Sequence, residues 1–184
     1  MNTYLEFEKP IEQLDNKVHE LKSLNDNAPS DNLLEEITQV EEQINETYRK
    51  IYSSISPWQR TLVARHPQRP KTREYIQNLI EDFFPLSGDR FFSEDKAILG
   101  GFGKFRGKTV LVLGHEKGHD TTSRIEHNFG MPRPEGYRKA QRLMKLAEDF
   151  DIPVISFVDT PGAYPGVGAE QRGQSEACLL YTSD

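Results

Sequence analysis

The chain has 184 residues, of which 35% are hydrophobic and 28% charged, and its formal net charge is −6. It contains no run of about 18 apolar residues, which excludes an ordinary membrane-spanning helix, and its acidic balance argues against nucleic acid as the main partner. A single cysteine, Cys178, excludes an intrachain disulfide framework and a cysteine-rich zinc site. The first residues lack a basic region followed by an apolar stretch, so we expect no secretory signal and a cytoplasmic protein.

Two amphipathic helices are predicted near the N-terminus. The first runs from about Pro10 to Leu24, and the second follows a polar breaker at 25–30, with Ser30 or Asp31 as its N-cap. We expect residues 1–56 to form a helical hairpin that serves packing rather than chemistry. The apolar residues at helical spacing are Ile11, Leu14, Val18, Leu21, Leu33, Ile37, Val40, Ile44, Tyr48 and Ile51.

From Pro57 onward the pattern changes to alternating helices and strands. The segment 106–108 contains a glycine between two apolar runs and is typical of a hairpin turn, whereas 114–135 is polar. Two strands, a helix and a third strand indicate an α/β core with parallel pairing across the helix. The predicted helices are 58–65, 73–83 and 136–150, and the predicted strands are 97–105, 109–113 and 152–158.

The most informative segment is the loop that follows the third predicted strand and leads into a helix near Ala169. Proline fixes φ and glycine allows close backbone approach, so the loop is stiff yet open to a ligand. A helix N-terminus also presents unpaired N–H groups. This order of elements favours a ligand site over a tight structural turn. The loop residues are Thr160, Pro161, Gly162, Ala163, Tyr164, Pro165 and Gly166.

Other motifs do not support the functions that they suggest. The segment 159–162 matches the D-x-x-G box of GTPases, but the upstream G-x-x-x-x-G-K-[ST] loop that would hold the phosphates is missing. No G-x-G-x-x-G lies between a strand and a helix, which argues against a dinucleotide site. No serine or cysteine lies on a recognisable nucleophile turn, so an acyl-enzyme mechanism is not predicted.

The segment 115–119 places two histidines four residues apart, with Glu116 after the first, as in zinc-binding helices. Gly118 interrupts it and a strand precedes it, so we expect a solvated strand-end loop instead. The surrounding region is locally basic, which predicts a solvated face, with a phosphate-bearing substrate or an acidic partner as the alternatives. These basic residues are Lys117, Arg124, Arg133, Arg138 and Lys139.

Several longer motifs occur together in one order. The most specific are Asn-Phe-Gly-Met-Pro at 128–132 and Pro-Glu-Gly-Tyr-Arg-Lys-Ala at 134–140, followed by 159–166 and the polar segment 170–176. With shorter motifs upstream, they make the chain from Met1 to about Ala177 resemble the α subunits of bacterial acetyl-coenzyme A carboxylase carboxyltransferases. The shorter motifs lie at 7–11, 64–70, 88–90, 95–98 and 114–118.

This resemblance implies a crotonase-like (ClpP/crotonase) fold of ββα units after the hairpin, with 57–177 as the N-terminal part of the carboxyltransferase domain. It implies transfer of a carboxyl group from carboxybiotin, carried on a separate biotin carboxyl carrier protein, to acetyl-CoA. The product is malonyl-CoA, in the first committed step of fatty acid synthesis. The loop 160–166 then forms the biotin-side wall of the pocket.

The resemblance also implies an α2β2 assembly in which zinc belongs to the zinc-ribbon β subunit, so that His115, His119 and His127 bind no metal. ATP is consumed by another subunit of the complex, the biotin carboxylase. The alternative function is a non-catalytic scaffold that only binds the β subunit.

Members of the family continue through a glycine-rich segment of the type GEGGSGGA, whose N–H groups hold the biotin ureido oxygen. That segment is missing from the sequence, and residues 178–184 do not continue the family's polar helix. We therefore expect an N-terminal fragment without a catalytic residue of its own, inactive and poorly stable alone. The strand 152–158, apolar on both faces, would lack neighbouring strands.

Overall fold

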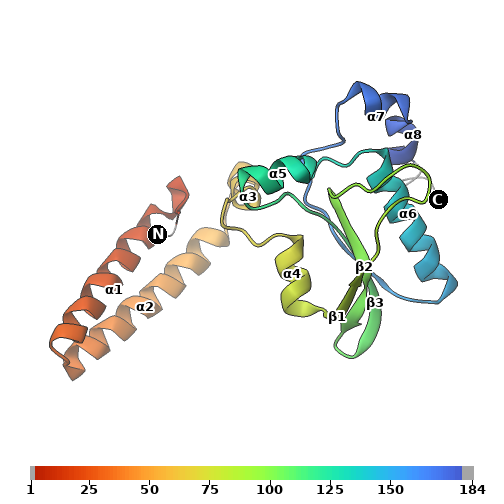
Figure 1. Cartoon of the computed structure of the whole chain (residues 1–184). Coiled ribbons are helices and arrows are strands. Elements are labelled where there is room, and N and C mark those ends of the chain that lie inside the picture. The colour runs from red at the N-terminus through yellow and green to blue at the C-terminus, as the bar shows by residue number, and fades with distance from the viewer. Residues whose placement is uncertain (1–2, 180–184) are drawn as a thin grey trace. The chain divides into compact units, whose positions relative to one another are not determined.

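The computed structural model describes residues 3–179 of the chain, and the fold divides into two compact units, Met1–Arg69 and Pro70–Asp184 (Figure 1). Residues 180–184, which belong to the predicted tail, lie outside the described residues. No helix within the described part combines the length and the apolar composition needed to cross a membrane.

Unit 1 consists of helices. The long helices α1 and α2 pack through a stripe of buried Val18, Leu21, Ile37 and Val40, which belong to the predicted apolar positions. Ser30 is the N-cap of α2, as predicted, although its side chain makes no capping hydrogen bond. The elements are the 3-10 turn η1 (Glu6–Glu8), α1 (Lys9–Asn27), α2 (Asp31–Tyr52) and α3 (Pro57–Ala64).

Unit 2 contains a four-stranded sheet within the described residues, in the order β1-β2-β3-β4. The strands are β1 (Glu81–Pro85), β2 (Ile98–Phe105), β3 (Lys108–His115) and β4 (Val154–Phe157). Antiparallel β2 and β3 meet at a tight turn in which Arg106 and Gly107 have φ of 51° and 76°. Positive φ at both central residues is the conformation of hairpin turns. β4 pairs with β3 in parallel, which confirms the predicted pairing.

Helices cover both faces of this sheet (Figure 1). On one face, Leu143 and Ala147 of α6 pack on Leu111 and Leu113 of β3. On the other, Ile76 of α4 packs on strand residues of the same sheet. The helical elements of unit 2 are α4 (Thr72–Leu79), α5 (Thr121–Glu126), the 3-10 turn η2 (Asn128–Gly130), α6 (Pro134–Asp149), α7 (Val167–Gln171) and α8 (Gln174–Leu179).

The prediction of helix over 73–83 is wrong at its end, because α4 stops at Leu79 and β1 begins at Glu81. Gly101 and Gly103 on β2 explain the difference. A Cβ atom on Gly101 would lie 2.3 Å from the carbonyl oxygen of Phe84, so the missing side chain lets β1 approach closely and pair. Pairing between strands thus overrides the local helical pattern, which carried no sign of the partner.

Candidate functional site

The carboxyl ends of the parallel strands β3 and β4 lie at the same edge of the sheet, where Gly114 is paired with Phe157. Ligands of open α/β sheets bind beyond the carboxyl ends of parallel strands. Two loops leave this edge: 116–120 after β3 and 158–166 after β4. The edge between these loops is therefore the candidate functional site.

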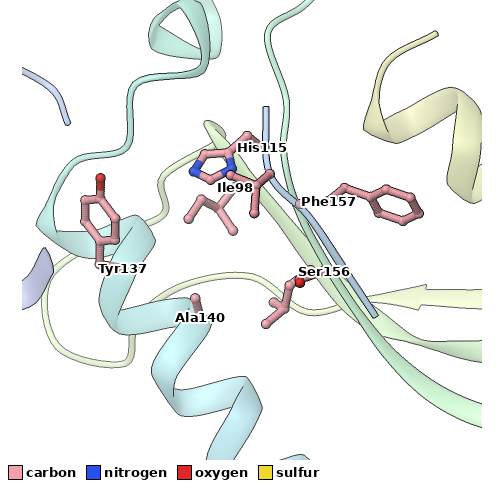
Figure 2. Close-up of a pocket in the computed structure, with 9 residues that line it drawn as sticks. Ile98, His115, Tyr137, Ala140, Ser156 and Phe157 are labelled. Carbon is pink, nitrogen blue, oxygen red and sulfur yellow. The ribbon is translucent and has the colours of Figure 1, made fainter. Parts of the chain in front are cut away.

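A cavity of about 90 Å³ opens here between the sheet and α6 (Figure 2). It is smaller than the several hundred Å³ typical of sites for whole cofactors or drug-sized ligands, so it can take a small group only. Its lining is largely apolar. The lining residues are Ile98, Leu113, Gly114, His115, Tyr137, Ala140, Ser156, Phe157 and Val158.

Three polar side chains line this cavity, Ser156 from β4, His115 from β3 and Tyr137 from α6, and Figure 2 shows the His115 and Tyr137 rings on different sides of it. The Phe157 ring points away from them, and it stacks on Tyr75 with ring centroids 5.4 Å apart. Burial, together with the thiol of neighbouring Cys178, raises the pKa of Tyr137 to about 12. Tyr137 therefore keeps its proton at neutral pH.

His115 lies close to the backbone of the loop after β4. The backbone N–H of Asp159 donates to its Nδ1 over 3.4 Å. Burial lowers the pKa of His115 below its ordinary 6.5, and a hydrogen bond to the backbone of Phe157 and the Asp159 carboxylate oppose this shift, while the Lys117 cation reinforces it. At neutral pH the site therefore contains a neutral imidazole that offers an N–H donor.

Next to this histidine, an ion pair fixes the start of the loop that follows β4. Lys117 Nζ lies 2.5 Å from Asp159 Oδ1, and both side chains are about 30% exposed. The backbone of Gly130, where φ is 76°, packs closely against the Lys117 side chain. A Cβ atom at Gly130 would lie only 2.6 Å from Lys117 Cγ. The Thr160 hydroxyl donates to the Gly130 carbonyl over 2.6 Å. The loop is thereby fastened to the segment that precedes α6.

The rest of the predicted loop folds onto the same segment. Tyr164 donates its N–H to the Pro132 carbonyl over 3.0 Å, and the Arg133 guanidinium lies 4.7 Å from the centroid of the Tyr164 ring. Gly166 is packed against that ring, since a Cβ atom there would lie 2.4 Å from a ring carbon. The loop then enters α7, as predicted, with Gly166 as N-cap.

The predicted loop residues thus lie together but beside the cavity, and none of them lines it. Gly162 has φ of 145°, a conformation that favours glycine, and no atom lies within 4 Å of the place of a Cβ. The space beside its Cα is therefore open, while its N–H donates to the Thr160 hydroxyl over 3.1 Å. The remaining residues, Pro161, Ala163 and Pro165, are exposed.

The prediction of a solvated strand-end loop at 115–119 is wrong for Glu116, whose side chain is fully buried. Glu116 accepts the N–H groups of Gly118 over 2.9 Å and of Arg73 over 3.1 Å, and so ties the start of α4 to the loop after β3. Among residues 3–179, no group of three or more His, Cys, Asp or Glu side chains is placed to hold a metal ion.

The solvated basic face predicted for the middle of the chain is also wrong at Lys139, which is 1% exposed. Its ammonium group donates to the carboxylate of Glu94 and to the carbonyls of Asp95 and Ile98. Asp95 is buried as well, and it accepts the N–H of Arg133 over 2.7 Å at the start of α6. Burial raises the pKa of Asp95, although its backbone hydrogen bonds and nearby cations oppose the shift.

Sequence reasoning missed these buried charges because a lysine or an aspartate in a polar stretch is usually exposed. One feature of the sequence does indicate that Lys139 is buried. It lies three residues after Gly136, on the face of α6 that carries the apolar residues. A Cβ atom at Gly136 would lie 2.5 Å from Asp95 Oδ2, so the glycine makes room for the carboxylate.

Comparison with known proteins gives the following likenesses. Residues 4–180 match the family model described as acetyl co-enzyme A carboxylase carboxyltransferase-like. The acetyl-coenzyme A carboxylase carboxyl transferase subunit alpha of Paramagnetospirillum magneticum is 56% identical over 173 residues, 94% of this chain and 54% of that protein. The subunit of the same name from Caulobacter vibrioides is 56% identical over 179 residues, 97% of this chain and 56% of that protein.

Two solved structures are similar at lower identity. A single-chain, multi-domain long-chain acyl-CoA carboxylase gives a TM-score of 0.48 at 24% identity over 62% of this chain and 11% of that chain. Transcarboxylase 12S gives 0.48 at 18% identity over 62% of this chain and 21% of that chain. The chain spans about half the length of the curated relatives it matches. Because the family model matches residues 4–180, nearly the whole of this chain, the chain belongs to the acetyl co-enzyme A carboxylase carboxyltransferase-like family.

Proposed function

We propose that the protein carrying this chain is the α subunit of an acetyl-CoA carboxylase carboxyltransferase. It moves a carboxyl group from carboxybiotin on a biotin carboxyl carrier protein to acetyl-CoA and forms malonyl-CoA for fatty acid synthesis. The observation that carries this proposal is 56% identity, over 94% of the chain, to a relative named as this subunit. Identity at this level over both units supports a shared activity and a crotonase-like fold.

The proposal assigns the loop 160–166 to the biotin side of the active site. The loop leaves room for a ureido ring, because no atom lies within 4 Å of a Cβ position at Gly162 and the neighbouring Thr160 is anchored to Gly130. When bound, carboxybiotin supplies the carboxyl group that is transferred. The residues of this chain hold the loop in a fixed position for the ring, since Thr160 and Tyr164 are anchored to Gly130 and Pro132.

The same proposal covers the assembly. The partners are a β subunit in an α2β2 complex, which holds the zinc, and the carrier protein, which holds the biotin. ATP is used elsewhere in the complex, and the location is the cytoplasm. Residues 57–177 form the N-terminal part of the carboxyltransferase domain, and the 184-residue chain alone is inactive.

Reconstitution tests this function against the alternative of a non-catalytic scaffold. The full-length gene product is combined with the β subunit, and malonyl-CoA is measured with carboxybiotin and acetyl-CoA as substrates. We expect turnover from the pair and none from either subunit alone.

The scaffold alternative makes a different prediction for the variant Gly166→Val, which would displace the Tyr164 ring. For a scaffold, assembly alone matters, and turnover should follow the amount of complex. For the proposed site, turnover should fall while the complex still assembles. Parental turnover in Gly166→Val would therefore contradict the assignment of the loop.

A further inference from the structure

The segment 128–133, which precedes α6, carries the loop that follows β4, and we call this segment the platform. The Gly130 carbonyl accepts the Thr160 hydroxyl over 2.6 Å, and the Pro132 carbonyl accepts the Tyr164 N–H over 3.0 Å. The position of the loop therefore depends on where these two platform carbonyls lie.

The start of the platform has an unfavourable backbone conformation. Asn128, Phe129 and Gly130 have φ of 47°, 56° and 76°. This left-handed region raises the free energy of residues other than glycine, and a bulky residue such as Phe129 adopts it only rarely. Strained backbone of this kind persists where surrounding contacts determine it, and it is concentrated at functional sites. Contacts with other segments must therefore hold the platform in this conformation.

Asp95, in the connection between β1 and β2, supplies such contacts at both ends of the platform. Its side chain is buried. The Oδ1 atom accepts the side-chain N–H of Asn128 over 3.2 Å, and the Oδ2 atom accepts the backbone N–H of Arg133 over 2.7 Å. One carboxylate thus binds the first and the last residue of the platform.

Asp95 is itself fixed to the sheet and to α6. Its Oδ1 atom also accepts the N–H of Ala97, just before β2, over 3.0 Å. Its carbonyl accepts the ammonium group of the buried Lys139 over 2.8 Å. The carboxylate therefore sets the position of the platform relative to the start of β2.

The arrangement requires a carboxylate rather than an amide. The two oxygens of Asp95 accept three N–H groups and donate none. An asparagine of the same shape has one acceptor oxygen and one NH2 group, so it would turn a donor toward either Asn128 or Arg133. A buried donor that faces another donor stays without a partner, which is unfavourable. The substitution Asp95→Asn should therefore release one end of the platform while keeping the size of the side chain.

We propose that Asp95 is a positioning residue for the carboxyl transfer, which holds the platform and, through it, the loop 160–166. This inference rests on the proposed function. Asp95 does not contact the substrate. Without its carboxylate the strained platform relaxes, and the carbonyls of Gly130 and Pro132 no longer hold the loop in one position.

The experiment uses the full-length gene product combined with the β subunit. In Asp95→Asn we expect kcat/KM for carboxybiotin to fall about tenfold or more, because small misplacements of a binding loop reduce the rate strongly. The KM for acetyl-CoA and the affinity between the subunits should stay parental. Parental kcat/KM in this variant would overturn the inference.

The matched control is Asp89→Asn, in the same connection between β1 and β2. Asp89 is also buried and accepts backbone N–H groups, but none of them belongs to the platform. This variant should keep parental kinetics. An equal loss in both variants would overturn the inference, because it would show a general effect of losing a buried carboxylate. The donors to Asp89 are the N–H groups of Phe91, Phe92 and Ser93.

A double-mutant cycle separates positioning from a merely structural role. Thr160→Val removes the bond between the loop and Gly130. If Asp95 acts through the platform, this bond loses its value once the platform is released. The loss of kcat/KM in Asp95→Asn/Thr160→Val should then be smaller, by about threefold or more, than the product of the two single losses. Losses that simply multiply would contradict the proposed route.

Hydrogen exchange measures the loop without any assay of turnover. In Asp95→Asn, peptides that cover 160–166 should exchange their amide hydrogens about tenfold faster than in the parent, while peptides from β3 keep parental exchange. Parental exchange in the loop would overturn the inference.

The failure of this inference is distinguishable from failure of the proposed function. If the parent protein forms no active pair with the β subunit, the proposed function falls and this inference falls with it. If the parent pair is active and Asp95→Asn has parental kinetics and exchange, the proposed function stands and only the role of Asp95 is wrong.

Discussion

Each of the two units is stabilised internally by a different kind of contact. In unit 1, α1 and α2 meet through an apolar stripe, and their ion pairs, Lys17–Glu36 and Lys22–Glu41, lie on the surface. In unit 2, Asp95, Glu116 and Lys139 are buried, and they bond to groups of distant segments. Periodicity is enough to fix the helix pair, whereas individual polar groups fix the loops at the site.

The difference shows where the chain is sensitive to substitution. A surface ion pair contributes little to stability, because water solvates the two separated charges almost as well. A buried charge that loses its partner is not solvated by water, so the loss destabilises the fold strongly. Chemically identical substitutions in the two units should therefore have very different effects, and the site in unit 2 should respond most.

The largest expected difference is between two lysines. The Lys139 side chain is 2% exposed and that of Lys22 is 53% exposed, and each is paired with a glutamate. Lys139→Met should lower the free energy of unfolding by about 3–5 kcal/mol, the cost of breaking a buried pair. Lys22→Met should change it by less than about 1 kcal/mol. Urea denaturation followed by circular dichroism measures both, and similar losses in the two variants would contradict the comparison.

A smaller effect is expected from pH. Because burial lowers the pKa of His115 in the folded chain, the unfolded chain binds a proton there more readily. Unfolding is then favoured as the pH falls through and below the ordinary value of 6.5, by at most about 1.4 kcal/mol per pH unit for one proton. His115→Gln should flatten the fall in stability between pH 7 and pH 5. An unchanged slope would show that His115 takes no part in it.

The smallest expected difference is between two threonines. Thr160 donates its hydroxyl to Gly130 at the part-buried start of the loop, and Thr38 donates to Leu34 on the exposed face of α2. Thr160→Val should cost about 1 kcal/mol, since it leaves the Gly130 carbonyl without this donor. Thr38→Val should be close to neutral, because water replaces the lost bond. Equal stabilities by the same urea titrations would contradict the role of Thr160 as an anchor.

Much of the architecture was predictable because it depends on local patterns. The apolar stripe places α1 and α2, the glycine in 106–108 places the β2–β3 turn, and strand order predicts parallel β4. The position of the loop 160–166 between a strand and a helix was predictable for the same reason.

The remaining features depend on contacts between distant segments. β1 pairs with β2 because Gly101 and Gly103 leave room for it, and the cavity is lined by residues of α6 together with β2, β3 and β4. Neither β1 nor the cavity produces a periodic sequence pattern in the residues that form it. The burial of Glu116 and Lys139 likewise depends on partners tens of residues away in the sequence.

The most direct test of the account compares two glycines in the reconstituted complex. Gly162 and Gly107 both have positive φ, of 145° and 76°, and no atom lies within 4 Å of a Cβ at either, but only Gly162 belongs to the loop. For Gly162→Val we predict a loss of about 100-fold in kcat/KM for carboxybiotin, with KM for acetyl-CoA and assembly unchanged. Gly107→Val should keep parental kinetics. Parental turnover in Gly162→Val, or equal losses in both variants, would contradict the assignment of the loop to the biotin side.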